Sequence, residues 1–185
     1  ARAYCQWLDG GSDLPTEAQW EKGARGGCEH NGGASGCKGG MRPYPWGEAA
    51  PSCDAAVFSS GGHGCGQSST WTVGSKPKGA SPYGAQDMTG NVWEWVLDLH
   101  DGAYYGNSPQ NDPVNNQSGS YRVKRGGSWS SAAGTLRAGI RAAGDPVSYD
   151  GFLGFRCAKA FDPCDDNNPC TVDTNDGSGN CSHES

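Results

Sequence analysis

The chain has 185 residues, of which 34% are hydrophobic, with 31 glycines and 11 prolines, and this argues against a helical bundle and for one loop-rich domain with a small appendage. Its net charge of −6, without a basic stripe, argues against nucleic acid as a partner, and no apolar run approaches the ~20 residues that cross a bilayer. Nine cysteines without a Cys-x-x-Cys pair indicate disulfides rather than zinc, and hence an extracytoplasmic, oxidising compartment.

Two helices are expected at the start of the chain. The opening residues, ARAYCQWL, are typical of a helix already under way, so we expect the N-terminal part of the domain to be missing. The segment LPTEAQWEKGARGG predicts a second helix, in which Thr16 caps the N-terminus and Gln19 completes a capping box. Gly26 offers a C-terminal stop. We interpret this as a surface helix with Trp20 packed inward.

Residues 28–80 are expected to be mostly loop. Two glycine-rich excursions of roughly ten residues are each flanked by a pair of cysteines. A local disulfide closes such a loop and stabilises the fold by ~3 kcal/mol, through the entropy that the unfolded chain loses. We therefore predict the pairs Cys28–Cys37 and Cys53–Cys65, although spacing alone leaves other connectivities open.

Three strands are predicted after these loops, from aromatic and β-branched residues in partial alternation. They are NVWEWVLDL at 91–99, SYRVKRGGSW at 120–129 and a closing strand, GFLGFRCAKAF, at 151–161.

The composition changes abruptly after Phe161. Residues 162–185 are acidic, with almost no large apolar side chain, and therefore predict a separate tail that resembles one unit of a cysteine-spaced repeat cut short. Its three cysteines, Cys164, Cys170 and Cys181, cannot all pair among themselves, and their pairing stays open.

The order of several motifs carries a resemblance to a known family. In chain order they are LPTEAQWEKGARGG, YPWG, SPYGAQDMTGNVWEWVLD, YRVKRGGSW, LRAGIRAAG and GFRCA. Residues 1–161 thereby resemble the formylglycine-generating enzyme, or sulfatase-modifying factor, superfamily. The resemblance implies an α+β, loop-rich fold that is a variant of the C-type lectin fold, here without its N-terminal portion.

Two structural features follow from the resemblance. It implies a disulfide between Cys5 and Cys157, which would stabilise the fold by more than ~4 kcal/mol because it closes most of the chain. It also implies a structural Ca²⁺ site, and calcium readily accepts carboxylate and carbonyl oxygens. Asp87 could instead cap a turn, and Glu94 could pair with Arg122 or Arg125. The implied ligands are the side chains of Asp87 and Glu94 and the carbonyls of Gly90 and Val92.

A second calcium site of the superfamily is expected to be absent. The position of its asparagine matches Ala56, and the downstream aspartate is missing. Because Cys53 and Cys65 flank the same loop, our hypothesis is that a covalent link replaces an ionic one.

The catalytic chemistry of the superfamily finds no match. The resemblance implies a copper(I) ion held by two thiolates shortly after the Arg-Gly-Gly-Ser motif, yet no cysteine stands between Cys65 and Cys157. Ser131 stands near the first ligand position, and a hydroxyl does not replace a soft thiolate, so we expect no copper. A second branch uses non-haem iron, but the four histidines show no facial-triad spacing. His100, the one histidine close to two aspartates, is interpreted as a solvated loop residue.

A binding module is the third interpretation. Trp and Arg are favoured anchors at interfaces, and some members of the superfamily diversify the corresponding face. Trp129 could equally be core, and Arg125, Arg137 and Arg141 could pair internally with Glu94, Asp98 or Asp145. The candidate surface comprises Trp129, Ser130, Ser131, Arg137, Arg141, Asp145, Tyr149 and Asp150.

The sequence therefore predicts a non-catalytic, calcium-stabilised and disulfide-braced extracytoplasmic domain that recognises a protein, peptide or glycan. The alternative is an oxidoreductase of the same superfamily, either a formylglycine-generating or a non-haem-iron enzyme, whose catalytic residues lie outside this chain.

Overall fold

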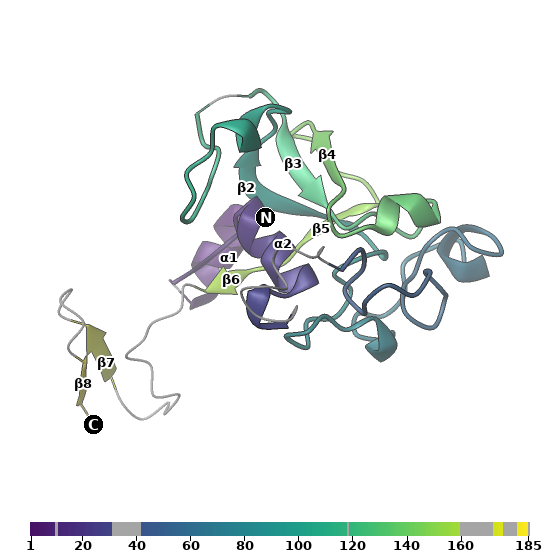
Figure 1. Ribbon diagram of the computed structural model, residues 1–185, viewed down its shortest axis with the longest axis horizontal. Coiled ribbons are helices and arrows are strands. Elements are labelled where there is room, and N and C mark those ends of the chain that lie inside the picture. The colour runs from purple at the N-terminus through teal and green to yellow at the C-terminus, as the bar shows by residue number, and fades with distance from the viewer. Residues whose placement is uncertain (10, 31–41, 118, 160–171, 176–180, 185) are drawn as a thin grey trace.

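The computed structural model describes residues 1–9, 11–30, 42–117, 119–159, 172–175 and 181–184. Two helices, α1 (Arg2–Asp9) and α2 (Glu17–Arg25), lie near the centre of Figure 1, beside a small mixed sheet and a set of long loops. The fold is α+β and loop-rich, as predicted. None of the helices in the described ranges is both long and apolar enough to span a bilayer.

The second helix follows the prediction closely. The backbone N–H of Gln19 donates to Thr16 Oγ1 at 3.1 Å, and the Thr16 N–H donates to Gln19 Oε1 at 2.9 Å, so the capping box is complete. Trp20 is buried with 1% of its surface exposed. The expectation of a surface helix is wrong at Glu17, which is fully buried because it receives two arginines from the sheet.

Four strands form the central sheet, in the order β4-β3-β2-β5. The strands β2 (Trp93–Leu99) and β3 (Arg122–Arg125) pair antiparallel, and so do β3 and β4 (Arg141–Gly144). The fourth strand, β5 (Leu153–Phe155), pairs with β2 in parallel. The predicted strand 120–129 ends early, because Gly126 and Gly127 have φ of 93° and 76° and turn the chain away. An apolar cluster joins α2 to this sheet. Its buried members are Trp20, Ala24, Met88, Val96, Val123 and Ala138.

The predicted closing strand 151–161 is two strands in different sheets, which corrects the expectation. After β5, the chain turns at Arg156 and Cys157, and β6 (Ala158–Lys159) pairs with β1 (Ser12–Asp13) in a separate two-stranded sheet. The break occurs where the Arg156 side chain reaches Glu94 and Cys157 bonds to Cys5. In the tail, β7 (Val172–Asn175) and β8 (Cys181–Glu184) form an antiparallel hairpin of their own. Cys164 and Cys170 lie outside the described residues.

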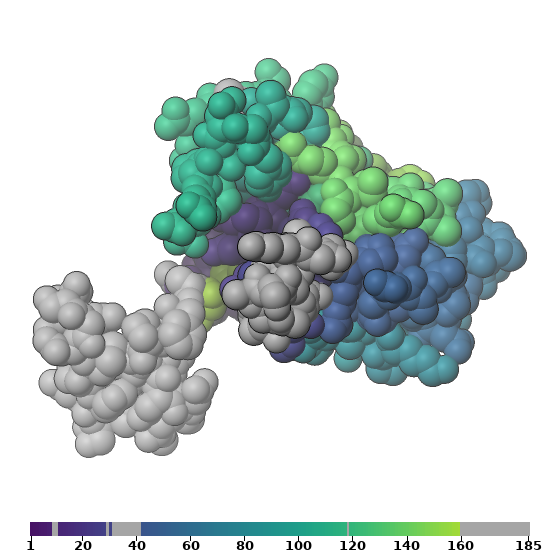
Figure 2. Space-filling view, in the orientation of Figure 1, coloured from purple at the N-terminus to yellow at the C-terminus, as the bar shows by residue number. Residues whose placement is uncertain are grey.

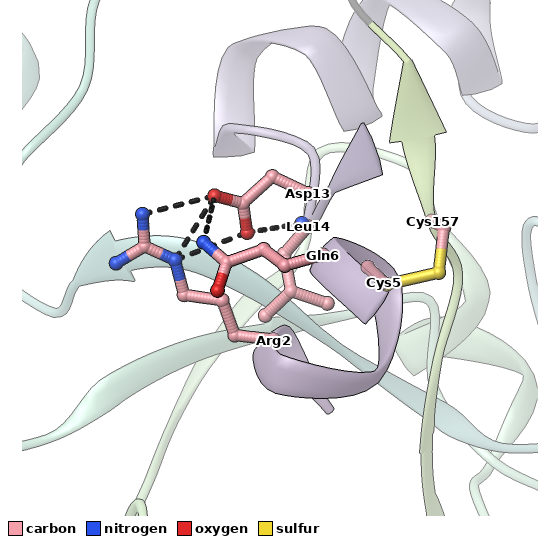
Figure 3. The surroundings of a disulfide bond; sticks show 6 residues. All are labelled: Arg2, Cys5, Gln6, Asp13, Leu14 and Cys157. Atoms are coloured by element: carbon pink, nitrogen blue, oxygen red, sulfur yellow. Dashed lines mark hydrogen bonds and ion pairs between the residues drawn. A yellow bond between two sulfur atoms is a disulfide. The ribbon is translucent and has the colours of Figure 1, made fainter. Parts of the chain in front are cut away.

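The disulfide between Cys5 and Cys157 is present, with a Cα–Cα distance of 5.3 Å, and it ties α1 to the chain between β5 and β6 (Figure 3). Cys5 is fully buried beside Leu14 and Trp95. On the outer side of α1, Arg2 and Gln6 both donate to the carboxylate of Asp13. The end of the domain is thus closed onto its start.

Residues 42–80 contain only short turns of 3-10 helix, as the loop prediction requires, and form one side of the molecule in Figure 2. The disulfide Cys53–Cys65 is present, with a Cα–Cα distance of 5.8 Å. Both cysteines pack against a small core of Tyr44, Ala56, Phe58 and Leu136. Cys28 is disulfide-bonded, and Cys37, its expected partner, lies outside the described residues.

Candidate functional site

The loop from Asp87 to Glu94 joins the irregular region to β2. Asp87 and Asn91 have positive φ values of 55° and 61°, and Gly90 has φ of 81°, so the backbone curls tightly before the strand begins. Asp87, Val92 and Glu94 line one cavity of about 300 Å³. Both expected carboxylates, Asp87 and Glu94, therefore line one cavity next to the expected turn.

Glu94 already has partners in this cavity. Its carboxylate accepts hydrogen bonds from Arg156 Nε and Nη2, both at 2.6 Å, and from Trp20 Nε1 at 2.7 Å. Burial disfavours the charged form of Arg156, but the hydrogen bonds and charge of Glu94, with a further contribution from Asp87, outweigh it and raise the pKa of Arg156. The alternative pairing of Glu94 with Arg122 or Arg125 is not formed. Arg122 donates to the Leu97 carbonyl, and Arg125, the cross-strand neighbour of Glu94, pairs with Glu21.

The donors of this loop are of the type that a calcium ion accepts. An ionised carboxylate offers about four acceptor positions. Of the three hydrogen bonds to Glu94, two go to Oε2 and one goes to Oε1, so one acceptor position on Oε1 is still open. Asp87 Oδ2 accepts from the Gly74 N–H at 2.6 Å, which leaves Oδ1 for a ligand. The hydroxyl of Thr89 is buried in the same loop without a hydrogen-bond partner among the described residues. Carboxylate, carbonyl and hydroxyl oxygens are the hard donors that calcium selects.

Trp129 lies on a separate part of the molecule, at the end of the Arg-Gly-Gly-Ser turn. Its indole N–H donates to the Gly151 carbonyl at 2.9 Å, and its ring stacks on Phe152 with centroids 5.0 Å apart. The His63 ring meets the Trp129 ring edge-on at 6.0 Å. Trp129 is half-buried, so this cluster of three rings is an ordered part of the surface, neither core nor a free side chain.

The residues after Trp129 lie against the loop that the Cys53–Cys65 disulfide closes. The Gly64 N–H donates to the Trp129 carbonyl at 2.7 Å, and the Ser59 N–H donates to the Ser131 carbonyl at 2.9 Å. Ser131 Oγ accepts from the Ser128 N–H and lies 3.2 Å from Ser128 Oγ. The Ser131 hydroxyl, which stands near the expected thiolate position, therefore stabilises the turn at Ser128.

Arg141 does not belong to this surface. Its guanidinium binds both carboxylate oxygens of Glu17, at 2.9 and 2.6 Å, and donates to the Asp101 carbonyl. Arg125 is fully buried and pairs with Glu21, with a longer 3.5 Å contact to Glu17. Both arginines are paired internally, but with Glu17 and Glu21 instead of the expected Glu94, Asp98 or Asp145.

This ionic cluster also affects the tyrosine beside it. Burial, together with the negative charges of Glu17 and Asp98, raises the pKa of Tyr105. The Arg141 guanidinium lies over the Tyr105 ring at 5.2 Å. These contacts hold α2 against β3 and β4, and they assign the cluster a structural part.

The remaining candidate residues are exposed but do not share one pocket. Arg137 lines a shallow pocket of about 250 Å³ with Arg25 and Pro43, and forms no ion pair with a described residue. Tyr149 is 94% exposed and, with Asp150, borders a pocket of about 410 Å³ above Trp95. Arg137 and Tyr149 therefore line separate pockets, and neither pocket includes a residue of the ring cluster.

The side chains that could hold a catalytic metal are dispersed. Every cysteine whose side chain is described (Cys5, Cys28, Cys53, Cys65 and Cys157) is in a disulfide. Across the described residues, no group of three or more His, Cys, Asp or Glu side chains gathers at metal-binding distance. His100 donates its backbone N–H to the Tyr121 carbonyl and is half-buried.

Comparison with known proteins identifies the family of this domain. The family model of the sulfatase-modifying factor enzyme 1-like domain matches residues 1–161. The chain belongs to this family. The formylglycine-generating enzyme of Streptomyces coelicolor is 38% identical over 88% of the chain and half of its own length. The hercynine oxygenase of Mycolicibacterium smegmatis is 39% identical over 85% of the chain and 35% of its own length.

Other members of the family have different names. The serine/threonine-protein kinase pkn1 of Chlamydia pneumoniae is 37% identical over 86% of the chain, but only 22% of its length is covered. The structure of PvdO from Pseudomonas aeruginosa matches with a TM-score of 0.66 and 26% identity, over 86% of this chain and 58% of that one. The chain thus spans between about a fifth and a half of the curated relatives that it matches.

The sequence analysis did not identify two members of the ring cluster, His63 and Phe152, or Asn91, which connects Trp129 to the neighbouring loops. His63 and Phe152 gave no signal, because nothing in the local pattern places them beside Trp129. Asn91 did give one: the pair Gly90-Asn91 is a common turn signal, and both residues have positive φ.

Proposed function

We propose that this chain is a non-catalytic, extracytoplasmic recognition domain of the sulfatase-modifying factor family. The observation that carries the proposal is Ser131. A hydroxyl stands near the position where the resemblance calls for a thiolate, and its oxygen is used in the Ser128 turn. The described cysteines, all oxidised, lie in other parts of the fold. Function resides in a site and not in a fold, and this family shares its domain among proteins of different names.

The proposed binding surface is the ring cluster of Trp129, Phe152 and His63, with Arg137 and Tyr149 as further exposed candidates that line separate pockets. Fixed aromatic rings bury a large area at little cost in conformational entropy, which suits them to bind a peptide, a protein or a glycan. The disulfide Cys53–Cys65 and the Gly151 carbonyl hold these rings in place before a ligand arrives. Such preorganisation raises affinity.

Peptide and glycan arrays test the recognition surface. Binding that is lost in Trp129→Ala and weakened in Arg137→Ala supports the proposal. The matched control is Trp7→Ala, because Trp7 is 76% exposed on α1, away from the ring cluster. Hits that survive Trp129→Ala and vanish in Trp7→Ala would place the binding surface elsewhere. A complete lack of hits with both ligand classes would leave only a structural role.

Calcium is proposed as a structural ion of the Asp87–Glu94 loop. The side chains of Asp87 and Glu94 and the carbonyls of Gly90 and Val92 would hold it, and the ion would supply a crosslink between the loop and β2. Titration calorimetry on EDTA-treated protein measures this directly. We expect binding that Asp87→Asn weakens strongly, while Asp112→Asn, an aspartate that also has positive φ but lies in another loop, leaves it unchanged. Equal affinity in both variants would refute the site.

An oxidoreductase remains the second candidate, because a formylglycine-generating enzyme and a hercynine oxygenase are both close relatives. In that case the redox-active ligands would come from sequence beyond this chain, and the ring cluster would bind part of the substrate. Assay of the full-length protein with a sulfatase-derived peptide separates the two proposals.

A further inference from the structure

One residue, Asn91, connects three segments that otherwise have no regular structure. Its backbone N–H donates to the Val57 carbonyl, and its carbonyl accepts from the Trp129 N–H, both at 2.8 Å. Its side chain holds the main chain of Trp71, accepting from the Trp71 N–H at 3.0 Å and donating to the Trp71 carbonyl at 3.1 Å. The whole residue is 4% exposed, and all its polar groups are used.

Asn91 also stands between the two carbonyls of the proposed calcium site. The Gly90 carbonyl and the Asn91 N–H belong to one peptide unit, and the Asn91 carbonyl and the Val92 N–H belong to the next. A cation that attracts the Gly90 carbonyl polarises and orients the first unit, which strengthens the bond from Asn91 to Val57. The Gly90 backbone packs directly on the Val57 backbone, because a Cβ on Gly90 would lie 2.5 Å from the Val57 carbonyl oxygen.

Further hydrogen bonds link the Asp87–Glu94 loop to the segment that carries Trp129. The Gly90 N–H donates to the Gly126 carbonyl at 2.9 Å, three residues before Trp129. Trp71, held by the Asn91 side chain, donates its indole N–H to the Gly64 carbonyl, and Gly64 in turn donates to the Trp129 carbonyl. The backbone of Trp129 is thus reached from Asn91 by one direct hydrogen bond and by one path through Trp71 and Gly64.

We propose that Asn91 is the positioning residue that couples cation binding in the Asp87–Glu94 loop to the conformation of Trp129, and thereby to ligand affinity. The inference rests on the proposed function, since it concerns the regulation of that surface. Ca²⁺ binding fixes the Gly90 and Val92 peptide units, Asn91 transmits their position to the Trp129 backbone, and the orientation of the already ordered Trp129 ring is adjusted for its ligand. By linkage, a bound ligand raises the affinity for Ca²⁺ by the same factor.

The test uses a readout that reports on Trp129 alone. The protein is labelled with 5-fluorotryptophan, and the Trp129 resonance among the seven tryptophans is assigned in the ¹⁹F NMR spectrum by Trp129→Phe. In the wild type, titration with Ca²⁺ is expected to shift this resonance and to saturate at the same Ca²⁺ concentration as the calorimetric signal. Asn91→Gly tolerates the positive φ and keeps the backbone bonds to Val57 and Trp129, but it removes the side-chain hydrogen bonds to Trp71. The part of the shift that passes through Trp71 and Gly64 is therefore expected to be lost while Ca²⁺ still binds.

The matched control is Asn115→Gly. Asn115 is also a buried asparagine, 3% exposed, and its side chain donates to the Leu99 carbonyl at the far end of β2. It is expected to lower stability while leaving the calcium-dependent shift of Trp129 intact. This control separates transmission by Asn91 from a general loosening of the fold.

The outcomes are distinct. Ca²⁺ binding without a response of Trp129 in the wild type, or an undiminished response in Asn91→Gly, overturns the coupling and leaves the calcium site standing. Loss of the response in Asn115→Gly as well as in Asn91→Gly overturns the specific part assigned to Asn91. Absence of Ca²⁺ binding overturns the coupling and the calcium site together, while the array experiments still decide on recognition.

Discussion

The two halves of the domain are held together by different means. Where α2 meets the four-stranded sheet, a buried set of charges joins Glu17 and Glu21 to Arg125 and Arg141, around the ring of Trp20. Residues 42–80 contribute no strand to a sheet. This region is held by the Cys53–Cys65 disulfide and by hydrogen bonds to other loops, such as the bond from the Trp71 N–H to the Asn91 side chain. The candidate binding surface lies along the border between these two halves.

The difference teaches where variation can occur without loss of the fold. A buried ion pair fails when either partner is removed, because the other charge is left without compensation. A loop closed by a disulfide is instead held at its ends, so its outer residues, such as His63, can change while the backbone stays in place. The charged half therefore provides the scaffold, and the looped half provides the surface.

Removing the disulfide that closes the whole domain is expected to have the largest effect. The Cys5→Ser/Cys157→Ser variant should lower the free energy of unfolding by about 5 kcal/mol, because the bridge spans 152 residues. Urea denaturation without reductant measures this. The Cys53→Ser/Cys65→Ser variant, with a separation of 12 residues, should lose about 3 kcal/mol. Equal losses in the two variants would contradict the loop-length argument.

Glu17→Gln is expected to rank next, with a loss of about 3–5 kcal/mol in the free energy of unfolding. The substitution leaves Arg141 and the buried Arg125 short of a counter-charge. Glu21→Gln serves as the control, because Glu21 is 26% exposed and water can compensate for part of the loss. Chemical denaturation of both variants should therefore rank Glu17 above Glu21, and the reverse order would show that the scaffold does not depend on this buried carboxylate.

The smallest effect concerns the dependence of stability on pH. Burial tends to raise the pKa of Asp13, but hydrogen bonds from Arg2, Leu14 and Gln6 and the charge of Arg2 lower it overall (Figure 3). Its contribution is therefore present above the ordinary carboxyl pKa of ~3.9 and is lost as the pH falls through the lower folded value. Asp13→Asn should flatten the fall in thermal stability below pH 4 relative to wild type. If Asp13→Asn leaves the fall in thermal stability at acid pH unchanged, other carboxylates cause that fall.

The sequence predicted what is local and missed what is distant. The capping box of Thr16 and Gln19 spans three residues, so the helix could be placed from its own segment. The burial of Glu17 on a predicted surface helix could not be foreseen, because its partner Arg141 lies 124 residues away and nothing in a single sequence joins them. The closing strand was predicted as continuous because Arg156 and Cys157 look like strand residues, while their partners Glu94 and Cys5 pull them out of the ladder.

The candidate site was predicted to a similar extent. The disulfide Cys5–Cys157 and the Asp87–Glu94 loop came from the resemblance, and the geometry of the loop agrees with them in the kind of donor it offers. Trp129 and Arg141 were both assigned to one face by the resemblance, and Arg141 does not lie there. A strand alternates its side chains, and on β4 the Arg141 side chain faces α2 and binds Glu17.

Mass spectrometry of a sulfatase-derived cysteine peptide, incubated with this protein, copper(I), oxygen and a thiol reductant, tests the central claim most directly. The account predicts that the cysteine stays unmodified, because Ser131 and its neighbours offer no thiolate near Trp129. Stoichiometric conversion of the peptide cysteine to formylglycine, sensitive to Ser131→Ala, would contradict it.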